Sequence, residues 1–153
     1  MWVDDKVRLL RVLGRGSMGE VWVGVHRSLK TEVAVKLILE ANADVDAAMR
    51  FTREARAAAK INDPHVVRIF DHGSTSDGVP YIVMELLDGE TLRERLERVG
   101  ALGTWETAVL LRQICKALAS AHGEGVVHRD IKPDNVFLVG ADESDFDPDV
   151  SST

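Results

Sequence analysis

The stretch His128-Arg129-Asp130-Ile131-Lys132-Pro133-Asp134-Asn135 carries the most information about the fold and the chemistry of this chain. Within it, Asn135 follows Asp130 at the fifth position. An aspartate can accept a hydrogen bond from a hydroxyl group, and the amide oxygen of an asparagine can bind Mg²⁺. The stretch is therefore a candidate site for a reaction of a hydroxyl group beside a metal ion.

A glycine-rich motif, Gly14-Arg15-Gly16-Ser17-Met18-Gly19, lies between two predicted strands. Val7–Leu13 precedes it, and Val21, Val23 and Val25 follow it with the period of two that is typical of a strand. In dinucleotide-binding folds the same G-x-G-x-x-G pattern leads from a strand into a helix, so the second strand argues against such a fold. Glycines here would let the backbone approach phosphate groups and donate N–H groups to them. An ordinary glycine-rich hairpin also explains the motif when it is taken alone.

A lysine in the next predicted strand, Glu32–Leu39, indicates a partner of opposite charge. An ammonium group in an apolar strand is unfavourable unless such a partner compensates it. Alternation places Ala34 and Lys36 on one face, where the small residue leaves room for a flat ring and the lysine can reach a phosphate. The alternative is a lysine at the sheet edge whose charge remains in solvent.

The helix that follows contains a carboxylate within its apolar stripe. Spacings of three and four residues predict a helical face formed by Ala47, Phe51, Glu54, Ala58 and Ile61. Asp63-Pro64 is expected to end the helix. A carboxylate that faces the core needs a cation, and Lys36 is the best candidate for Glu54. A solvated glutamate on the helix surface is the alternative.

Two further strands are predicted before the chain becomes helical. They are Val66–Phe70 and Tyr81–Met84, with the turn-rich segment Gly73–Gly78 between them. Thr91 and Glu94 predict a capping box that begins a short helix. The apolar face of this helix is Leu92, Leu96 and Val99.

A longer helix is predicted from about Thr104 to Ala121. Its apolar face consists of Leu110, Leu111, Ile114, Leu118 and Ala121, with Cys115 near it as a small core residue. Val126-Val127 and Val136–Val139 are predicted as short strands on either side of residues 128–135. Strands followed by helices indicate an α+β protein with two lobes rather than a βαβ alternation.

Together these motifs resemble those of eukaryotic-type serine/threonine protein kinases in their bacterial form. Residues 128–135 match the catalytic loop H-R-D-x-x-x-x-N, and residues 14–21 match the glycine loop G-x-G-x-x-G-x-V. Val33-Ala34-Val35-Lys36 matches the lysine-bearing strand, and Tyr81–Gly89 looks like the hinge. The resemblance covers nearly the whole chain up to Val139.

The resemblance implies the α+β protein-kinase fold, with a complete five-stranded N-lobe that contains one helix and the first part of a helical C-lobe. Residues 1–153 would form a partial kinase domain. The implied boundaries are 1–84 for the N-lobe, 85–89 for the hinge, 90–139 for the start of the C-lobe, 128–135 for its catalytic loop and 140–153 for an acidic turn or tail.

The resemblance also implies an activity and the residues that perform it. Such kinases transfer the γ-phosphoryl group of ATP to Ser or Thr hydroxyl groups of proteins with Mg²⁺. Asp130 is implied as the base, Lys132 as the residue that neutralises the transferring phosphate of Ser/Thr kinases, and Asn135 as a magnesium ligand. Lys36 and Glu54 would form the ion pair of an active kinase.

The residues implied to bind ATP come from the glycine loop, the sheet and the hinge. They are Leu13, Gly14, Gly16, Ser17, Gly19, Val21, Ala34, Lys36, Met84 as the gatekeeper, Glu85 through its carbonyl, Leu87 through its N–H, and Phe137.

One element of the family pattern is missing. The family binds magnesium with the aspartate of an Asp-Phe-Gly motif, which Asp145-Phe146-Asp147 resembles only superficially. Asp147 replaces the flexible glycine, and Gly140–Ser144 lacks the large apolar residues of the strand that should lead into the motif. The chain is expected to end before the true motif, which leaves its own catalytic activity open. The alternative function is a truncated, non-catalytic nucleotide-binding or interaction module.

A truncated C-lobe also predicts low stability. If about four large side chains of the long helix lose their usual cover, the loss is roughly 6–12 kcal/mol. The net stability of a whole domain is typically only ~5–15 kcal/mol. We therefore expect a marginally stable or aggregation-prone chain.

Composition and charge narrow the range of binding partners expected for this chain. The formal net charge is −6, and five acidic residues without any Lys or Arg lie in 140–153, so the remainder is nearly neutral. This argues against nucleic acid or an anionic membrane as the main partner. The partners that the resemblance implies are ATP and proteins with Ser/Thr acceptors. The single cysteine, Cys115, excludes an intramolecular disulfide. With no signal peptide and no membrane-spanning stretch recognisable, a cytoplasmic location without membrane contact is expected.

Overall fold

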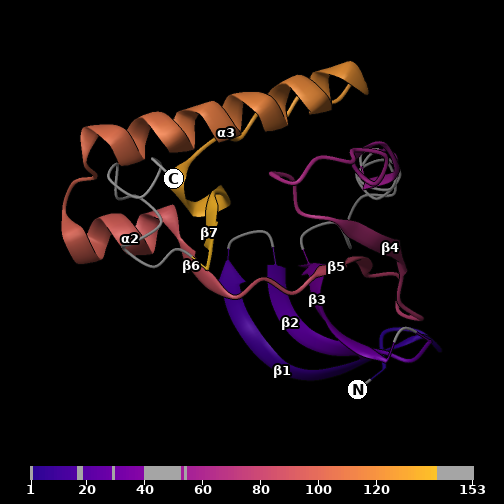
Figure 1. The fold of residues 1–153 in the computed structure, drawn as a ribbon. Helices are drawn as coiled ribbons and strands as arrows, with labels where there is room; N and C mark the ends of the chain where they lie inside the picture. The colour runs from indigo at the N-terminus through magenta and orange to yellow at the C-terminus, as the bar shows by residue number, and fades with distance from the viewer. Residues whose placement is uncertain (1, 17–18, 29, 40–52, 54, 141–153) are drawn as a thin grey trace.

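The N-terminal lobe is an antiparallel sheet. The structure is a computed structural model that describes residues 2–16, 19–28, 30–39, 53 and 55–140. The sheet has 5 strands in the order β1-β2-β3-β5-β4 (Figure 1). The strands are β1 (Val7–Gly16), β2 (Gly19–His26), β3 (Thr31–Ile38), β4 (Ile69–Ser74) and β5 (Pro80–Glu85). The predicted five-stranded lobe is confirmed, although β1 and β2 extend further into the glycine motif than expected.

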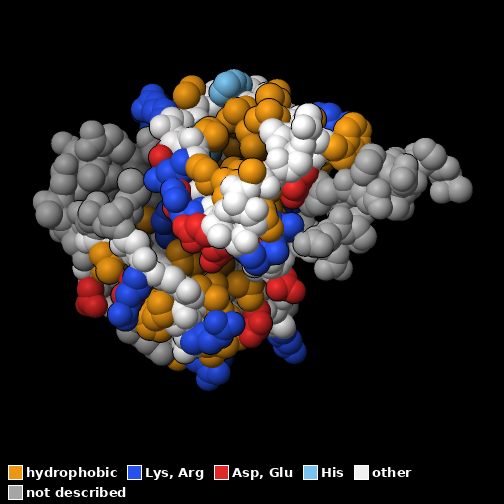
Figure 2. Space-filling view, turned by 90° about the vertical axis from the view of Figure 1, so that its left-hand side faces the viewer, with side chains coloured by type: hydrophobic (Ala, Val, Ile, Leu, Met, Phe, Trp, Pro, Cys, Tyr) orange, Lys and Arg blue, Asp and Glu red, His pale blue; other side chains and the backbone are white. Residues whose placement is uncertain are grey.

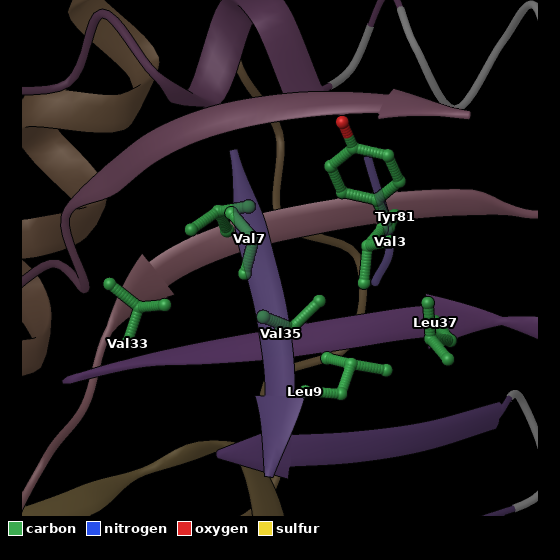
Figure 3. Packing of buried hydrophobic residues seen from close by; sticks show 8 residues of the cluster. Val3, Val7, Leu9, Val33, Val35, Leu37 and Tyr81 are labelled. Carbon is green, nitrogen blue, oxygen red and sulfur yellow. The ribbon is translucent and has the colours of Figure 1, made fainter. Parts of the chain in front are cut away.

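A hydrophobic cluster covers one face of this sheet. Val33 and Val35 are completely buried and alternate with Ala34 and Lys36, which lie on the opposite face. The cluster consists of Val3, Val7, Leu9, Val33, Val35, Leu37, Tyr81 and Val83. Figure 3 shows side chains from β1, β3 and β5 converging in this layer. Because the β-branched residues fill one face, the other face is left for the Ala34 and Lys36 side chains.

The C-terminal part begins directly after β5. Its elements are β6 (Gly89–Thr91), α2 (Leu92–Val99), α3 (Thr104–Gly123), the single-turn 3₁₀ helix η2 (Pro133–Asn135) and β7 (Phe137–Val139). The predicted capping box of α2 is confirmed, since Glu94 N–H donates to Thr91 Oγ1 at 3.2 Å and Thr91 N–H donates to Glu94 Oε2 at 2.7 Å. β6 and β7 pair antiparallel. This pairing brings the start of α2 beside the segment that carries Asp130.

Two predicted strands differ from the structure. β4 begins at Ile69 rather than Val66, because residues 64–66 form a turn in which Val66 N–H donates to the Asp63 carbonyl at 3.1 Å. Val126-Val127 is not a strand, because Val126 N–H donates to the Ala121 carbonyl at 2.9 Å and so closes the end of α3. Both segments have apolar β-branched residues, but local hydrogen bonds decide their conformation.

The buried face of α2 also differs from the prediction. Val99 is 41% exposed, whereas Arg95 is only 4% exposed. Arg95 Nε donates to Glu90 Oε1 at 2.6 Å. An arginine stem can be buried when its charged head has such a partner, which hydrophobic periodicity alone does not reveal.

The apolar face of α3 is narrower than predicted. Leu110 and Ala121 are buried and Ile114 and Leu118 are half-buried, in agreement with the prediction. Leu111 is 56% exposed, and Cys115 is exposed rather than a core residue. Both lie one position beyond the stripe formed by Leu110, Ile114 and Leu118 and therefore point away from the covered side.

Several apolar side chains are exposed, so low stability of the folded chain remains a prediction. Trp105, Leu111 and Val127 are each at least half exposed. Since burial of such side chains supplies most of the stability of a domain, we expect no cooperative thermal transition of a monomer above about 55 °C. Calorimetry combined with light scattering checks this, and a monomeric transition above that temperature would contradict it.

The two lobes are joined by a contact outside the hinge. Ser120 Oγ, near the end of α3, donates to Asp63 Oδ2 at 2.6 Å. Asp63 lies in the segment that leads into β4. The contact fixes the end of α3 that leads into residues 128–135. None of the helices in the described residues is long and apolar enough to cross a membrane.

Candidate functional site

The face of the sheet opposite the hydrophobic cluster collects residues predicted to bind ATP. The register aligns Val21 with Lys36, and Ala34 with Met84. Cross-strand partners and residues two positions apart lie on the same face, so these four side chains from three strands share one surface. Ala34 is 5% exposed, and Lys36, Val21 and Met84 are half-buried. These four side chains therefore form an apolar surface that carries one ammonium group.

The glycines of the motif do not have the same structural role. Gly19 has φ +147°, and a Cβ there would lie 1.9 Å from the Leu37 carbonyl oxygen. Gly14 and Gly16 have nothing within 4 Å of a built Cβ. Gly19 is thus required by the close approach of β2 to β3, whereas Gly14 and Gly16 face open space that a ligand can enter. Leu13, in the irregular part of β1 before Gly14, is 44% exposed.

The hinge leaves polar backbone groups beside this face. Glu85 ends β5, where its N–H donates to the Arg68 carbonyl at 3.0 Å and its Oε1 accepts from Arg68 N–H at 2.6 Å. Leu87 N–H donates to no other described residue. Phe137, predicted to contact the same ligand, is 37% exposed at the start of β7.

Asp130, Lys132 and Asn135 form one cluster. Lys132 Nζ lies 3.1 Å from Asp130 Oδ2, and Asn135 Nδ2 donates to the same oxygen at 2.9 Å. Asn135 Nδ2 also donates to the Asp130 carbonyl at 2.8 Å. A carboxylate held by an ammonium group and an amide is fixed in orientation while its other oxygen stays available.

The backbone before Asp130 is unusual. Arg129 has φ 61°, a left-handed conformation that is uncommon for residues other than glycine. Asp130 N–H donates to His128 Nδ1 at 3.2 Å, so the histidine holds this loop from within. The conformation turns the Asp130 side chain toward Lys132 and Asn135.

Electrostatics keeps Asp130 ionised. The hydrogen bond from Lys132 is the main cause that lowers the pKa of Asp130 below 3.8, and the bond from Asn135 is the next. Since the pKa of Asp130 is depressed in the folded state, the stabilisation from these contacts is fully present above the unfolded-state pKa. It is lost as the pH falls through the folded-state pKa. We therefore expect Asp130 to stay charged to a lower pH than an unperturbed aspartate does.

A titration tests this cause directly. We expect the carboxyl carbon resonance of Asp130 to titrate below 3.8 in the wild type and closer to 3.8 in Lys132→Met, because the variant loses the largest stabilising contact of the charged form. Carbon-detected NMR over pH 2–6 measures both midpoints. Equal midpoints in the two proteins would show that Lys132 does not set the pKa.

The oxygen atoms of Asn135 and Asp130 are of the chemical type that binds magnesium. Because Asn135 Nδ2 faces Asp130, its amide oxygen is directed elsewhere and accepts no hydrogen bond from a described residue. Amide and carboxylate oxygens are the ligands that Mg²⁺ prefers. In the described part of the chain, no three His, Cys, Asp or Glu side chains come together as a complete metal site.

Two predicted site residues, Ser17 and Glu54, lie outside the described residues, as do Asp145-Phe146-Asp147 and residues 141–153 in general. The Lys36–Glu54 pair therefore stays a prediction.

The sequence did not predict an ion pair beside the catalytic loop. Arg93 of α2 contacts Asp134 of η2 through two hydrogen bonds, Nε to Oδ1 at 2.6 Å and Nη2 to Oδ2 at 2.9 Å. The partners are 41 positions apart, and no local pattern links them. Figure 2, which looks at the molecule from the side on which α2 lies in Figure 1, shows acidic and basic side chains intermixed near the centre of this face.

Comparison with known proteins agrees with the fold and the motifs. The family described as "Protein kinase domain" matches residues 7–146. The chain is 41% identical over 137 residues to the serine/threonine-protein kinase pkn2 of Myxococcus xanthus and 45% identical over 134 residues to Pkn1 of the same organism. These matches cover 89% and 86% of the chain but only 16% and 19% of the two relatives.

Solved structures give the same result. The kinase domain of Mycobacterium tuberculosis PknI superimposes with a TM-score of 0.79 at 32% identity, over 88% of this chain and 56% of that one. The chain thus spans about half of a solved kinase domain and about a fifth of the curated relatives. The described strands, α2, α3 and the cluster around Asp130 belong to one partial domain, and the chain is a member of the protein kinase domain family, among relatives that are serine/threonine kinases.

Proposed function

We propose that this chain binds ATP with Mg²⁺ and transfers the γ-phosphoryl group to Ser or Thr hydroxyl groups of proteins. The observation that carries the proposal is the cluster of Asp130, Lys132 and Asn135, in which a carboxylate is oriented by an ammonium group and an amide. Phosphoryl transfer needs little covalent chemistry from the protein, so orientation and charge compensation of this kind are its main requirements. Membership of the kinase family supports the same assignment.

Each member of the cluster has a distinct role. Asp130 accepts the hydrogen bond of the acceptor hydroxyl and takes its proton as the new oxygen–phosphorus bond forms and the bond to the ADP oxygen breaks. Lys132 compensates the charge on the transferring group. Asn135 would hold Mg²⁺ through its amide oxygen, and the ion, when bound, would supply charge neutralisation at the phosphates.

The nucleotide is proposed to lie on the face of the sheet opposite the hydrophobic cluster. Val21, Ala34 and Met84 share that face, and the proposal has the adenine ring pack there with Leu13 and Phe137. The Glu85 carbonyl and the Leu87 N–H are the hinge groups for the edge of the ring. Lys36, paired with Glu54, and the backbone of Gly14, Gly16, Ser17 and Gly19 are proposed to hold the phosphates.

The proposed boundaries follow this arrangement. Residues 1–84 form the N-lobe, 85–89 the hinge and 90–139 the start of the C-lobe. Residues 140–153 are the acidic remainder, and 141–153 lie outside the described residues. The proposed partners are ATP and Ser/Thr-containing proteins, and the proposed location is the cytoplasm.

A peptide set that differs only in the acceptor tests the proposal. The chain is incubated with γ-labelled ATP, Mg²⁺ and three peptides that carry Ser, Thr or Tyr in an otherwise identical sequence. We expect label on the Ser and Thr peptides and none on the Tyr peptide. Label on the Tyr peptide alone would contradict the assignment. Nucleotide binding by calorimetry without any transfer would instead support the second candidate, a non-catalytic nucleotide-binding module.

A further inference from the structure

We infer that Arg93 is a positioning residue for the catalytic loop, which it holds to α2 through Asp134. Its expected effect on Mg²⁺ rests on the proposed function of Asn135. The ion pair has two parallel hydrogen bonds, at 2.6 and 2.9 Å. A planar guanidinium that meets both oxygens of a carboxylate fixes the direction of the carboxylate as well as its position.

Asp134 is placed so that fixing it also fixes Asn135. It is the central residue of η2, between Pro133 and Asn135. Asn135 N–H donates to the Lys132 carbonyl at 2.9 Å, and its side chain donates to Asp130. One turn of 3₁₀ helix is short and contains a proline whose φ is restricted, so a constraint on its middle residue reaches both ends.

Other contacts hold this loop only from its C-terminal side. Leu92 N–H donates to the Val136 carbonyl at 2.8 Å, and β6 pairs with β7. Among the described residues, the hydrogen bonds made by residues 128–133 stay within residues 128–136. Among these contacts from other elements, the Arg93–Asp134 pair therefore joins the loop at the position nearest to Asp130 in the sequence.

Charge gives the pair a second effect. Lys132 also acts electrostatically on Asp134, so two carboxylates lie within range of its ammonium group. Because Arg93 is the principal partner of Asp134, Lys132 remains with Asp130. Removal of Arg93 leaves Asp134 to compete with Asp130 for Lys132.

The pair is too exposed to be important mainly for stability. The two side chains are 53% and 40% exposed, and ion pairs at such sites add little to the stability of a fold. Positioning and stability can therefore be separated by experiment.

The first measurement is amide hydrogen exchange of the whole 153-residue chain without ligand. In Arg93→Gln we expect the Asn135 amide to exchange about two- to fivefold faster than in wild type, the range expected for an exposed ion pair, with the melting temperature changed by less than about 2 °C. Arg93→Lys keeps the charge but loses the planar fork, so an intermediate rate is expected. The double variant Arg93→Asp/Asp134→Arg should recover part of the protection.

The second measurement is Mg²⁺ dependence of ATP binding. In Arg93→Gln we expect the Mg²⁺ concentration for half-saturation to rise about three- to tenfold, with ATP affinity in the absence of Mg²⁺ unchanged. Arg112→Gln is the matched control, because Arg112 is an exposed arginine of α3, away from this site, and it should change neither readout.

The two measurements test the inference and the proposed function separately. Unchanged exchange at Asn135 in Arg93→Gln overturns the inference. Faster exchange with an unchanged Mg²⁺ dependence overturns the proposed role of Asn135 as a magnesium ligand. A wild-type chain that binds no ATP overturns the proposed function, while the exchange rates still decide whether Arg93 positions the loop.

Discussion

Replacement of Asp130 by Asn is expected to lower phosphoryl transfer to a serine peptide by about a hundredfold to ten-thousandfold, the usual contribution of a general base. The amide has nearly the same shape as the carboxylate but cannot take the proton of the acceptor hydroxyl. ATP affinity should change little, because Asp130 acts on the acceptor rather than on the nucleotide. Initial rates with labelled ATP and calorimetric titration with ATP measure the two quantities.

The variant has a natural control in Asp77→Asn. Asp77 is an exposed carboxylate in the turn between β4 and β5, far along the chain from the cluster. It loses the same charge and should leave the transfer rate unchanged. Transfer by Asp130→Asn at more than about a tenth of the wild-type rate would exclude Asp130 as the general base.

Gly19→Ala is expected to have the largest effect on stability. Its new Cβ would meet the Leu37 carbonyl oxygen at 1.9 Å, and φ +147° is itself rare for residues other than glycine. Strain of this kind costs about 1–3 kcal/mol before any separation of β2 from β3 is counted. In a domain of this size we expect the melting temperature to fall by about 10 °C or more, measured by circular dichroism.

The same motif supplies the control. Gly16→Ala adds an identical methyl group where nothing lies within 4 Å, so stability should change by less than about 0.5 kcal/mol. If Gly16 faces the phosphates, this variant should instead weaken ATP binding. Equal losses of melting temperature in the two variants would show that the clash at Leu37 does not explain the need for Gly19.

The two faces of β3 could be predicted because its residues follow a period of two. Val33 and Val35 are buried on one side, and Ala34 and Lys36 lie on the other, as a period of two requires. The capping box of α2 was equally readable, because Thr91 and Glu94 are three positions apart and contact each other. Local spacing determines both features, so the sequence contains all the information they need.

Features that depend on distant partners could not be predicted. β6 is only 3 residues long and exists because β7 pairs with it. Arg95 is buried because Glu90 neutralises it, and the Arg93–Asp134 pair joins residues 41 positions apart. Val126-Val127 has strand-like residues, but its hydrogen bond goes back to α3. In each case tertiary contacts override local propensity.

The candidate site divides in the same way. The sequence identified Asp130, Lys132 and Asn135, and the structure brings these three together. It also identified Lys36 and Ala34 on one face, which the register supports. The contacts that position the loop come from α2, and a motif confined to residues 128–135 contains no information about them.

The left-handed backbone at Arg129 has a consequence for how this sequence can change. A φ of 61° costs a residue with a Cβ roughly 1–2 kcal/mol, a cost that glycine avoids. Glycine would at the same time allow the peptide before Asp130 many more orientations. Variants chosen only for heat resistance should therefore accumulate glycine at this position, whereas variants chosen for phosphate transfer should retain a residue with a side chain. Position 129 is thus a place where selection for durability and selection for catalysis favour different amino acids.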